Sequence, residues 1–125
     1  MTTRYFTVEE ANALLPRLEP LMKRLLERRA RAARMSRELE HLLQDVRIDF
    51  GGRLPSALAL DFMEIERLIR QIQSLGCLVK DINVGLVDFL AERNGRDVYL
   101  CWRYGEPEVG YFHELHTGYN GRQRV

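Results

Sequence analysis

Three side chains in the last third of the 125-residue sequence, Asp88, Cys101 and His113, are of types that do chemistry together. A carboxylate, a thiol and an imidazole can serve as base, nucleophile and acid when they lie within hydrogen-bonding reach. The same three types also bind zinc when they converge on one ion. These residues are well separated along the chain, so the elements that carry them decide whether they meet.

A hairpin is predicted around Asn94-Gly95, the favoured pair for a two-residue type I′ turn. With these two residues as the loop, Asp88 pairs with Cys101 on adjacent strands. The alternation along both strands collects an apolar face of Val87, Phe89, Ala91, Val98, Leu100 and Trp102. The opposite, polar face collects Asp88, Tyr99, Cys101 and Arg103.

A further strand is predicted over residues 109–115, after a turn at 104–108. Pairing of Arg103 with Val109 would place His113 on the polar face and Phe112 on the apolar face. A slip of one residue would place Glu114 on the polar face instead. We prefer the first register because it buries Phe112.

Before the sheet, a capping box at Thr7 to Glu10 predicts the start of a helix. Prolines 16 and 20 predict that this helix ends near Leu15, with a kink or a fresh start near Pro16. Beyond Pro20 we expect an unbroken helix to about residue 46.

Apolar residues then recur every three or four positions from Leu14 to Val46, a coiled-coil-like seam that only Arg28 interrupts. After a loop at 48–55, a second helix repeats this spacing, and Gly76 suits its C-terminal cap. The first helix is longer, roughly 45 Å against roughly 30 Å. From this mismatch we expect a homodimer.

The fold class is therefore α+β, an antiparallel long-helix hairpin packed on a three- to four-stranded antiparallel sheet. We expect one domain over residues 1–125, comprising the hairpin at 7–75, a β-meander at 77–115 and a C-terminal tail at 116–125.

Charge and composition restrict the partners. With 19 basic and 18 acidic residues the sequence lacks the excess charge of nucleic-acid-binding domains, so nucleic acid is unlikely. No apolar run is long enough to span a membrane. Two cysteines and the absence of an apolar leader predict a cytoplasmic protein.

Five segments of the last third together resemble one family: VKD at 79–81, GLVDF at 85–89, VYLCWRYGEPE at 98–108, FHE at 112–114 and GYNGR at 118–122. They are similar to the small bacterial proteins grouped as domain of unknown function 2203, and the opening at 6–22 is similar as well. Such relatives usually carry Trp where this chain has Phe112. The resemblance implies family motif positions for Asp88, Cys101, Trp102, Glu106, His113 and Arg122, and it assigns none of them a role.

The candidate binding or catalytic cluster is Asp88, Cys101, Glu106, His113 and Arg122. We favour a non-enzymatic binding or assembly module, with a small anion or a protein as partner. The alternative is a metal- or thiol-dependent enzyme using the polar sheet face. The sequence leaves any cofactor unknown. It predicts no metal site, because the weak candidates His113, Glu114 and His116 cannot share an ion unless the strand ends between the two histidines.

Overall fold

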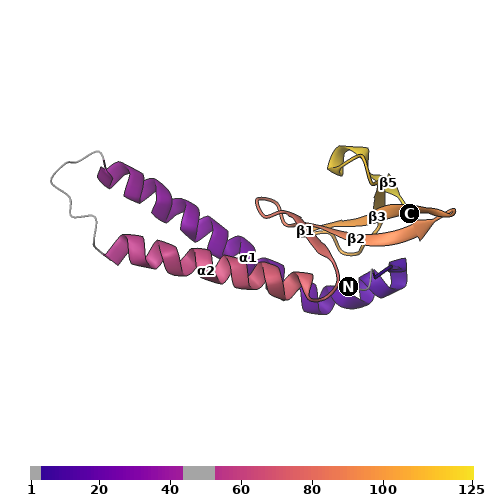
Figure 1. Ribbon diagram of the computed structural model, residues 1–125, viewed down its shortest axis with the longest axis horizontal. Helices are drawn as coiled ribbons and strands as arrows, with labels where there is room; N and C mark the ends of the chain where they lie inside the picture. The colour runs from indigo at the N-terminus through magenta and orange to yellow at the C-terminus, as the bar shows by residue number, and fades with distance from the viewer. Residues whose placement is uncertain (1–3, 44–52) are drawn as a thin grey trace.

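The computed structural model describes residues 4–43 and 53–125 and has the predicted α+β architecture (Figure 1). Its elements are α1 (Val8–Leu43), α2 (Arg53–Gln73), β1 (Leu78–Asp81), β2 (Leu86–Arg93), β3 (Arg96–Arg103), β4 (Tyr111–Glu114), the short 3-10 helix η1 (Tyr119–Gly121) and β5 (Gln123–Arg124). Within the described residues, neither helix has a stretch apolar enough to cross a membrane.

The capping box forms as predicted at the start of α1. The Thr7 hydroxyl accepts from the Glu10 backbone N–H at 3.1 Å, and the Glu10 carboxylate accepts from the Thr7 N–H at 2.9 Å. The predicted break near Pro16 is wrong, because α1 is one helix through both prolines. Both proline rings are exposed, whereas Leu18 and Met22 on the opposite side are fully buried. Burial of that inner face outweighs the backbone hydrogen bonds that the prolines cannot make.

Helices α1 and α2 form the expected hairpin, and Arg28, which interrupts the apolar seam, has its partner on the facing helix. Asp61 is only 1% exposed, and its two oxygens lie 3.1 Å from Arg28 Nη1 and 3.2 Å from Arg31 Nε. The expected end of the first helix near residue 46 and the loop residues 48–52 lie outside the described residues. The predicted loop is too long at its end, because α2 already begins at Arg53. After α2, Gly76 takes the left-handed conformation (φ 107°) predicted for the cap.

The sheet is antiparallel with strand order β1-β2-β3-β4-β5, one strand more than expected. The extra strand, β5, comes from the segment predicted as a tail. Asn94 (φ 53°) and Gly95 (φ 79°) form the left-handed two-residue turn, and Asp88 pairs with Cys101 as predicted. The preferred register of β4 is also confirmed, since Leu100 pairs with Phe112.

The apolar face of the sheet packs on the N-terminal part of α1 and the C-terminal end of α2 (Figure 1). The rest of the two helices projects beyond the sheet as an arm, with no third layer against it (Figure 1). Trp102 and Phe89 from the sheet and Leu18 and Met22 from α1 are among the largest fully buried side chains. η1 lies on the other side of the sheet, over the polar face (Figure 1).

Candidate functional site

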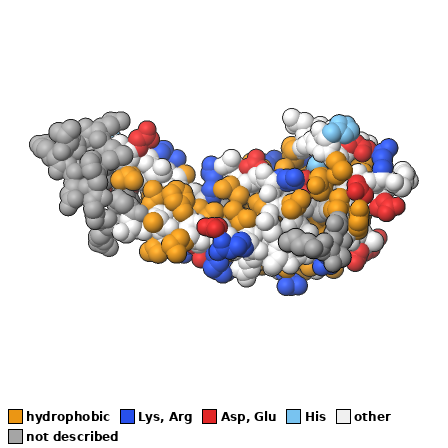
Figure 2. Space-filling view, in the orientation of Figure 1, with side chains coloured by type: hydrophobic (Ala, Val, Ile, Leu, Met, Phe, Trp, Pro, Cys, Tyr) orange, Lys and Arg blue, Asp and Glu red, His pale blue; other side chains and the backbone are white. Residues whose placement is uncertain are grey.

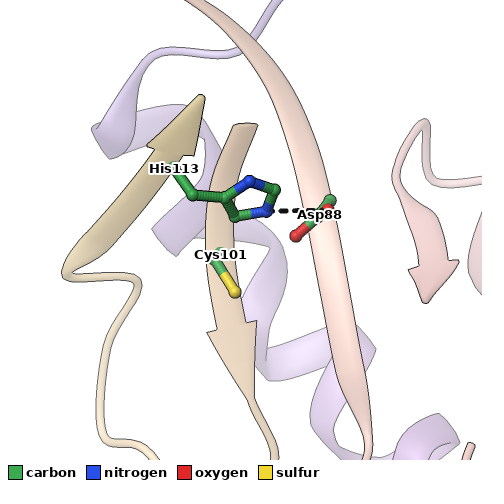
Figure 3. A group of neighbouring side chains, drawn as sticks. All are labelled: Asp88, Cys101 and His113. Carbon is green, nitrogen blue, oxygen red and sulfur yellow. Dashed lines mark hydrogen bonds and ion pairs between the residues drawn. The ribbon is translucent and has the colours of Figure 1, made fainter. Parts of the chain in front are cut away.

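Asp88, Cys101 and His113 lie on three neighbouring strands and meet on the face turned away from the helices (Figure 3). Asp88 in β2 is paired directly with Cys101 in β3. His113 in β4 is paired with Tyr99, and its ring reaches across β3 so that Nε2 lies 3.0 Å from Asp88 Oδ2. One ligand atom from each of the three residues lies within 4.8 Å of the others.

The three side chains are buried although they lie on the polar face. Cys101 is 0% exposed, Asp88 2% and His113 3%. Tyr99 covers one side, with its ring centroid 5.6 Å from that of His113, and Lys80 Nζ lies 5.0 Å from the Tyr99 ring. Polar groups so far from water need partners within the protein.

The tautomer of His113 follows from its hydrogen bonds. Its Nδ1 lies 2.8 Å from the backbone carbonyl oxygen of Glu114, which can only accept, so Nδ1 carries a proton. In a neutral imidazole the other nitrogen, Nε2, then bears a lone pair and faces Asp88 Oδ2. Two acceptors at 3.0 Å need a cation between them, which is either a shared proton or a metal ion.

The cluster has unused ligand capacity. Asp88 Oδ1 is buried and accepts from no nitrogen or hydroxyl of residues 4–43 and 53–125, and the carboxylate has only the weakly donating Cys101 thiol beside it. Burial first, and then the negative charge of Asp88, raises the pKa of the Cys101 thiol to about 12, against the lowering effect of the Arg122 charge. Without a metal the thiol is therefore protonated and unreactive near neutral pH.

Glu106 and Arg122, the other two residues of the predicted cluster, bind each other. Arg122 Nη2 lies 2.7 Å from both carboxylate oxygens of Glu106. The Arg122 guanidinium also stacks between two aromatic rings, at 4.0 Å from Tyr111 and 4.6 Å from Tyr119. Because Tyr111 is the strand partner of Cys101, this pair lies beside the buried cluster.

Two of the weak metal candidates lie apart from this cluster. The Glu114 carboxylate binds Arg96 at 2.7 Å, and His116 is exposed in the turn after β4. Of the three, only His113 joins the site, with Asp88 and Cys101 as its neighbours.

Sequence reasoning missed Lys80 and Tyr119 as parts of the cover. Lys80 lies in the VKD segment of the family resemblance, but nothing in the sequence placed it over the polar face, because it contributes only through the pairing of β1 with β2. Tyr119 is adjacent in sequence to the Asn-Gly-Arg stretch that contains Arg122, and that aromatic next to a site arginine was an available signal.

Comparison with known proteins gives one match. A family model described as "Uncharacterized conserved protein (DUF2203)" matches residues 4–125. No curated protein and no solved structure matches the chain.

Proposed function

The chain belongs to the DUF2203 family, and we propose that it is a binding module for a divalent transition-metal ion held by Asp88, Cys101 and His113. The observation that carries this proposal is the buried carboxylate of Asp88. One oxygen faces the lone pair of His113 Nε2, and the other accepts from no nitrogen or hydroxyl among the described residues. A cation bound by the imidazole nitrogen and one carboxylate oxygen would supply the positive charge that this contact requires.

The donor set fits zinc best. Zinc binds carboxylate oxygen, histidine nitrogen and cysteine sulfur at about 2.0–2.3 Å, which places ligands of a tetrahedral ion about 3.5 Å apart. The three atoms lie within 4.8 Å of one another, close to that spacing. Thiolate ligation also selects against magnesium and calcium, which prefer oxygen ligands.

The histidine is already oriented as a ligand. Metal-binding imidazoles usually donate their second N–H to a carbonyl or carboxylate, which fixes the tautomer and the ring. His113 makes this bond to the Glu114 carbonyl. Three protein ligands leave a fourth position for water or another small ligand.

A thiol-dependent enzyme is less well supported. A nucleophilic cysteine needs a lowered pKa and access to its substrate. The Cys101 thiol has a pKa raised to about 12 and is fully buried. A bound metal ion would supply the nearby positive charge that stabilises a thiolate.

Titration of the metal-free, untagged protein with Co²⁺ tests the proposal. One equivalent should produce the intense absorption of a cobalt–thiolate bond, and Zn²⁺ should abolish it by competition. Cys101→Ser should remove the band, and Asp88→Asn should weaken binding by roughly 10- to 100-fold or more. Cys77→Ser is the matched control, because Cys77 is equally buried but belongs to the helical side of the sheet.

Two results would overturn metal binding at this site. One is a protein that takes up no stoichiometric Co²⁺ or Zn²⁺ while remaining folded by circular dichroism. The other is a thiolate band that persists in Cys101→Ser and disappears in Cys77→Ser.

Assembly through the helical arm is a second candidate function, favoured by apolar side chains that the arm exposes (Figure 2). Leu60, Phe62 and Met63 on α2 are 62%, 55% and 64% exposed. Residues 23–41 of α1 hold seven basic and three acidic residues, a net charge of +4, and residues 56–66 of α2 hold three acidic and no basic residues. Within the protomer Asp61 and Glu64 already bind arginines of α1, so a second copy would dock mainly through the exposed apolar residues of α2.

Light scattering after size exclusion tests this dimer. Met63→Glu should convert a dimer to a monomer without unfolding the chain, because Met63 faces solvent within the protomer. Val84→Glu, which changes an exposed apolar residue outside the arm, should leave the dimer intact. A wild-type protein that stays monomeric at high concentration would rule out the second copy.

A further inference from the structure

The metal ligands are too deeply buried for an ion to enter the folded protein as it stands, so some part of the cover must move. Residues 115–125, which we term the C-terminal strap, run from the end of β4 through η1, which lies on the same side of the sheet as the cluster, to β5 at the sheet edge (Figure 1). Through β5 the strap pairs with β4, where Phe112 faces Gln123. The helices cover the other face, and Tyr99 and Lys80 belong to strands β3 and β1, so the strap is the part of the cover that can move without opening the core.

The strap is held mainly by polar contacts. None of the three residues of η1 is buried, and both residues of β5 are exposed. The exception is Arg122, whose side chain is 10% exposed and holds both oxygens of Glu106. A weaker bond joins Arg103 to the Tyr119 hydroxyl at 3.3 Å. Segments with little buried apolar surface open at low free energy.

The strap is coupled to the orientation of His113. The Glu114 carbonyl that accepts from His113 Nδ1 also accepts from the Thr117 backbone N–H at 3.1 Å and from the Thr117 hydroxyl at 3.2 Å. The first turn of the strap and the imidazole therefore share one anchor. Movement of the strap would remove two of the three donors to this carbonyl and leave the bond from His113 Nδ1.

We propose that the C-terminal strap is a gate over the Asp88–Cys101–His113 cluster and that the Arg122–Glu106 ion pair is its latch. The function of the gate depends on the proposed metal binding. Its opening, however, exposes Cys101 whether or not a metal binds. Metal enters and leaves when the latch opens, and the closed strap keeps the loaded site away from water.

The reactivity of Cys101 toward an aromatic disulfide reagent measures opening directly in metal-free protein. Cys77→Ala provides a background with one thiol. In that background Arg122→Gln should raise the reaction rate roughly tenfold or more, since loss of the ion pair makes opening easier by about 1.4 kcal/mol or more. Loss of the Arg122 charge by itself would disfavour the thiolate and slow the reaction, so acceleration reports opening.

Arg96→Gln is the matched control. It removes an arginine that binds Glu114 over the same 2.7 Å but does not hold the strap, so the thiol rate should stay within about twofold of the background. Both variants are checked for folding by circular dichroism. A rate in Arg122→Gln that is unchanged or slower than the background overturns the gate.

Zinc kinetics separate the gate from the metal site. In Arg122→Gln, uptake of Zn²⁺ and its loss to a chelator should both accelerate, again by roughly tenfold. If Cys101 reacts faster but no variant or wild-type protein takes up zinc, the strap is a gate to the thiol and the proposed metal binding is wrong. If zinc binds but its exchange and the thiol rate are both unchanged, the site stands and the gate is wrong.

Discussion

His113 and Asp88 lie on strands either side of β3, and their side chains meet above it with Nε2 3.0 Å from Oδ2. Cys101 occupies the strand between them, and its sulfur lies within 4.8 Å of a ligand atom from each of the other two residues. Because His113 Nδ1 is committed to the Glu114 carbonyl, this contact needs a positive charge from a proton or a metal. The chemistry of the site therefore depends on what supplies that charge.

We predict that Asp88→Asn separates metal binding from stability. Its amide nitrogen can donate to the lone pair of neutral His113 Nε2, so the free energy of unfolding of the metal-free protein should fall by about 1 kcal/mol or less. Asp88→Ala leaves Nε2 buried without a partner and should cost about 3 kcal/mol. Urea unfolding of the two variants makes the comparison. Equal losses would contradict the assigned tautomer.

A second prediction concerns the buried carboxylate in the arm. Asp61 occupies a seam position between Leu58 and Ile65 and is held by Arg28 and Arg31, whose side chains are 41% and 49% exposed. Asp61→Leu continues the apolar seam and lets both arginines return to water. We expect a gain in the free energy of unfolding of about 1 kcal/mol or more.

Thermal and urea unfolding measure that gain, with Glu66→Leu as control. Glu66 lies on the outer face of α2 with its side chain 70% exposed, so its replacement should change stability by about 0.5 kcal/mol or less. A clear loss of stability in Asp61→Leu would mean that the ion pairs of Asp61 with the two arginines stabilise the fold more than an apolar side chain at this position does.

The sheet was predictable because one local signal fixes it. Asn94-Gly95 sets the turn, and the alternation of apolar residues then sets which face each side chain takes, so the pairing of Asp88 with Cys101 followed from sequence. The burial of Phe112 fixed the next register in the same way. The continuity of α1 through Pro16 was not predictable locally, because it depends on tertiary burial of the opposite face.

The candidate site was predictable in membership more than in arrangement. The strand pattern places His113 on the same face as Asp88, but a diagonal reach across β3 depends on side-chain rotamers that alternation does not specify. The bond between Glu106 and Arg122 joins a turn to the strap. The short strand β5 carries no periodic pattern, so no sequence signal placed it beside β4.

Our third prediction concerns alkaline pH. Burial raises the pKa of both Cys77 and Cys101 to about 12, whereas an unfolded cysteine titrates near about 8.5. The unfolded state thus loses thiol protons first, and stability that is complete below about pH 8.5 is lost as the pH rises toward 12. Each thiol contributes a slope of at most about 1.4 kcal/mol per pH unit.

Urea unfolding of the metal-free protein at several pH values between about 8 and about 11 measures this slope. Because other groups titrate in the same range, the informative quantity is the difference between variants. Cys101→Ala and Cys77→Ala should each reduce the slope, and the double variant should reduce it by the sum. A slope that is the same in all four proteins would contradict burial of the neutral thiols.

The last prediction compares two glycines that share a left-handed backbone but differ in their surroundings. Gly95 (φ 79°) lies in the exposed hairpin turn, where an added Cβ would meet no atom of the described residues within 4 Å. Gly85 (φ 75°) lies at the start of β2, where an added Cβ would lie 2.8 Å from the Tyr104 Cβ and 3.2 Å from Met22 Cγ. Gly95→Ala should cost only the backbone strain, about 1 kcal/mol.

Gly85→Ala should cost that strain and a steric term, together about 3 kcal/mol or more, because Tyr104 directly follows β3 and its Cβ cannot move without the end of that strand. The Gly85 carbonyl also accepts from the Tyr104 N–H at 2.9 Å, which fixes the two backbones against each other. Chemical unfolding of the two single variants under the same conditions gives the difference directly. Equal losses of stability in the two variants would mean that Tyr104 can move away from an added Cβ at Gly85. The sheet would then be able to shift away from α1 at this end of β2.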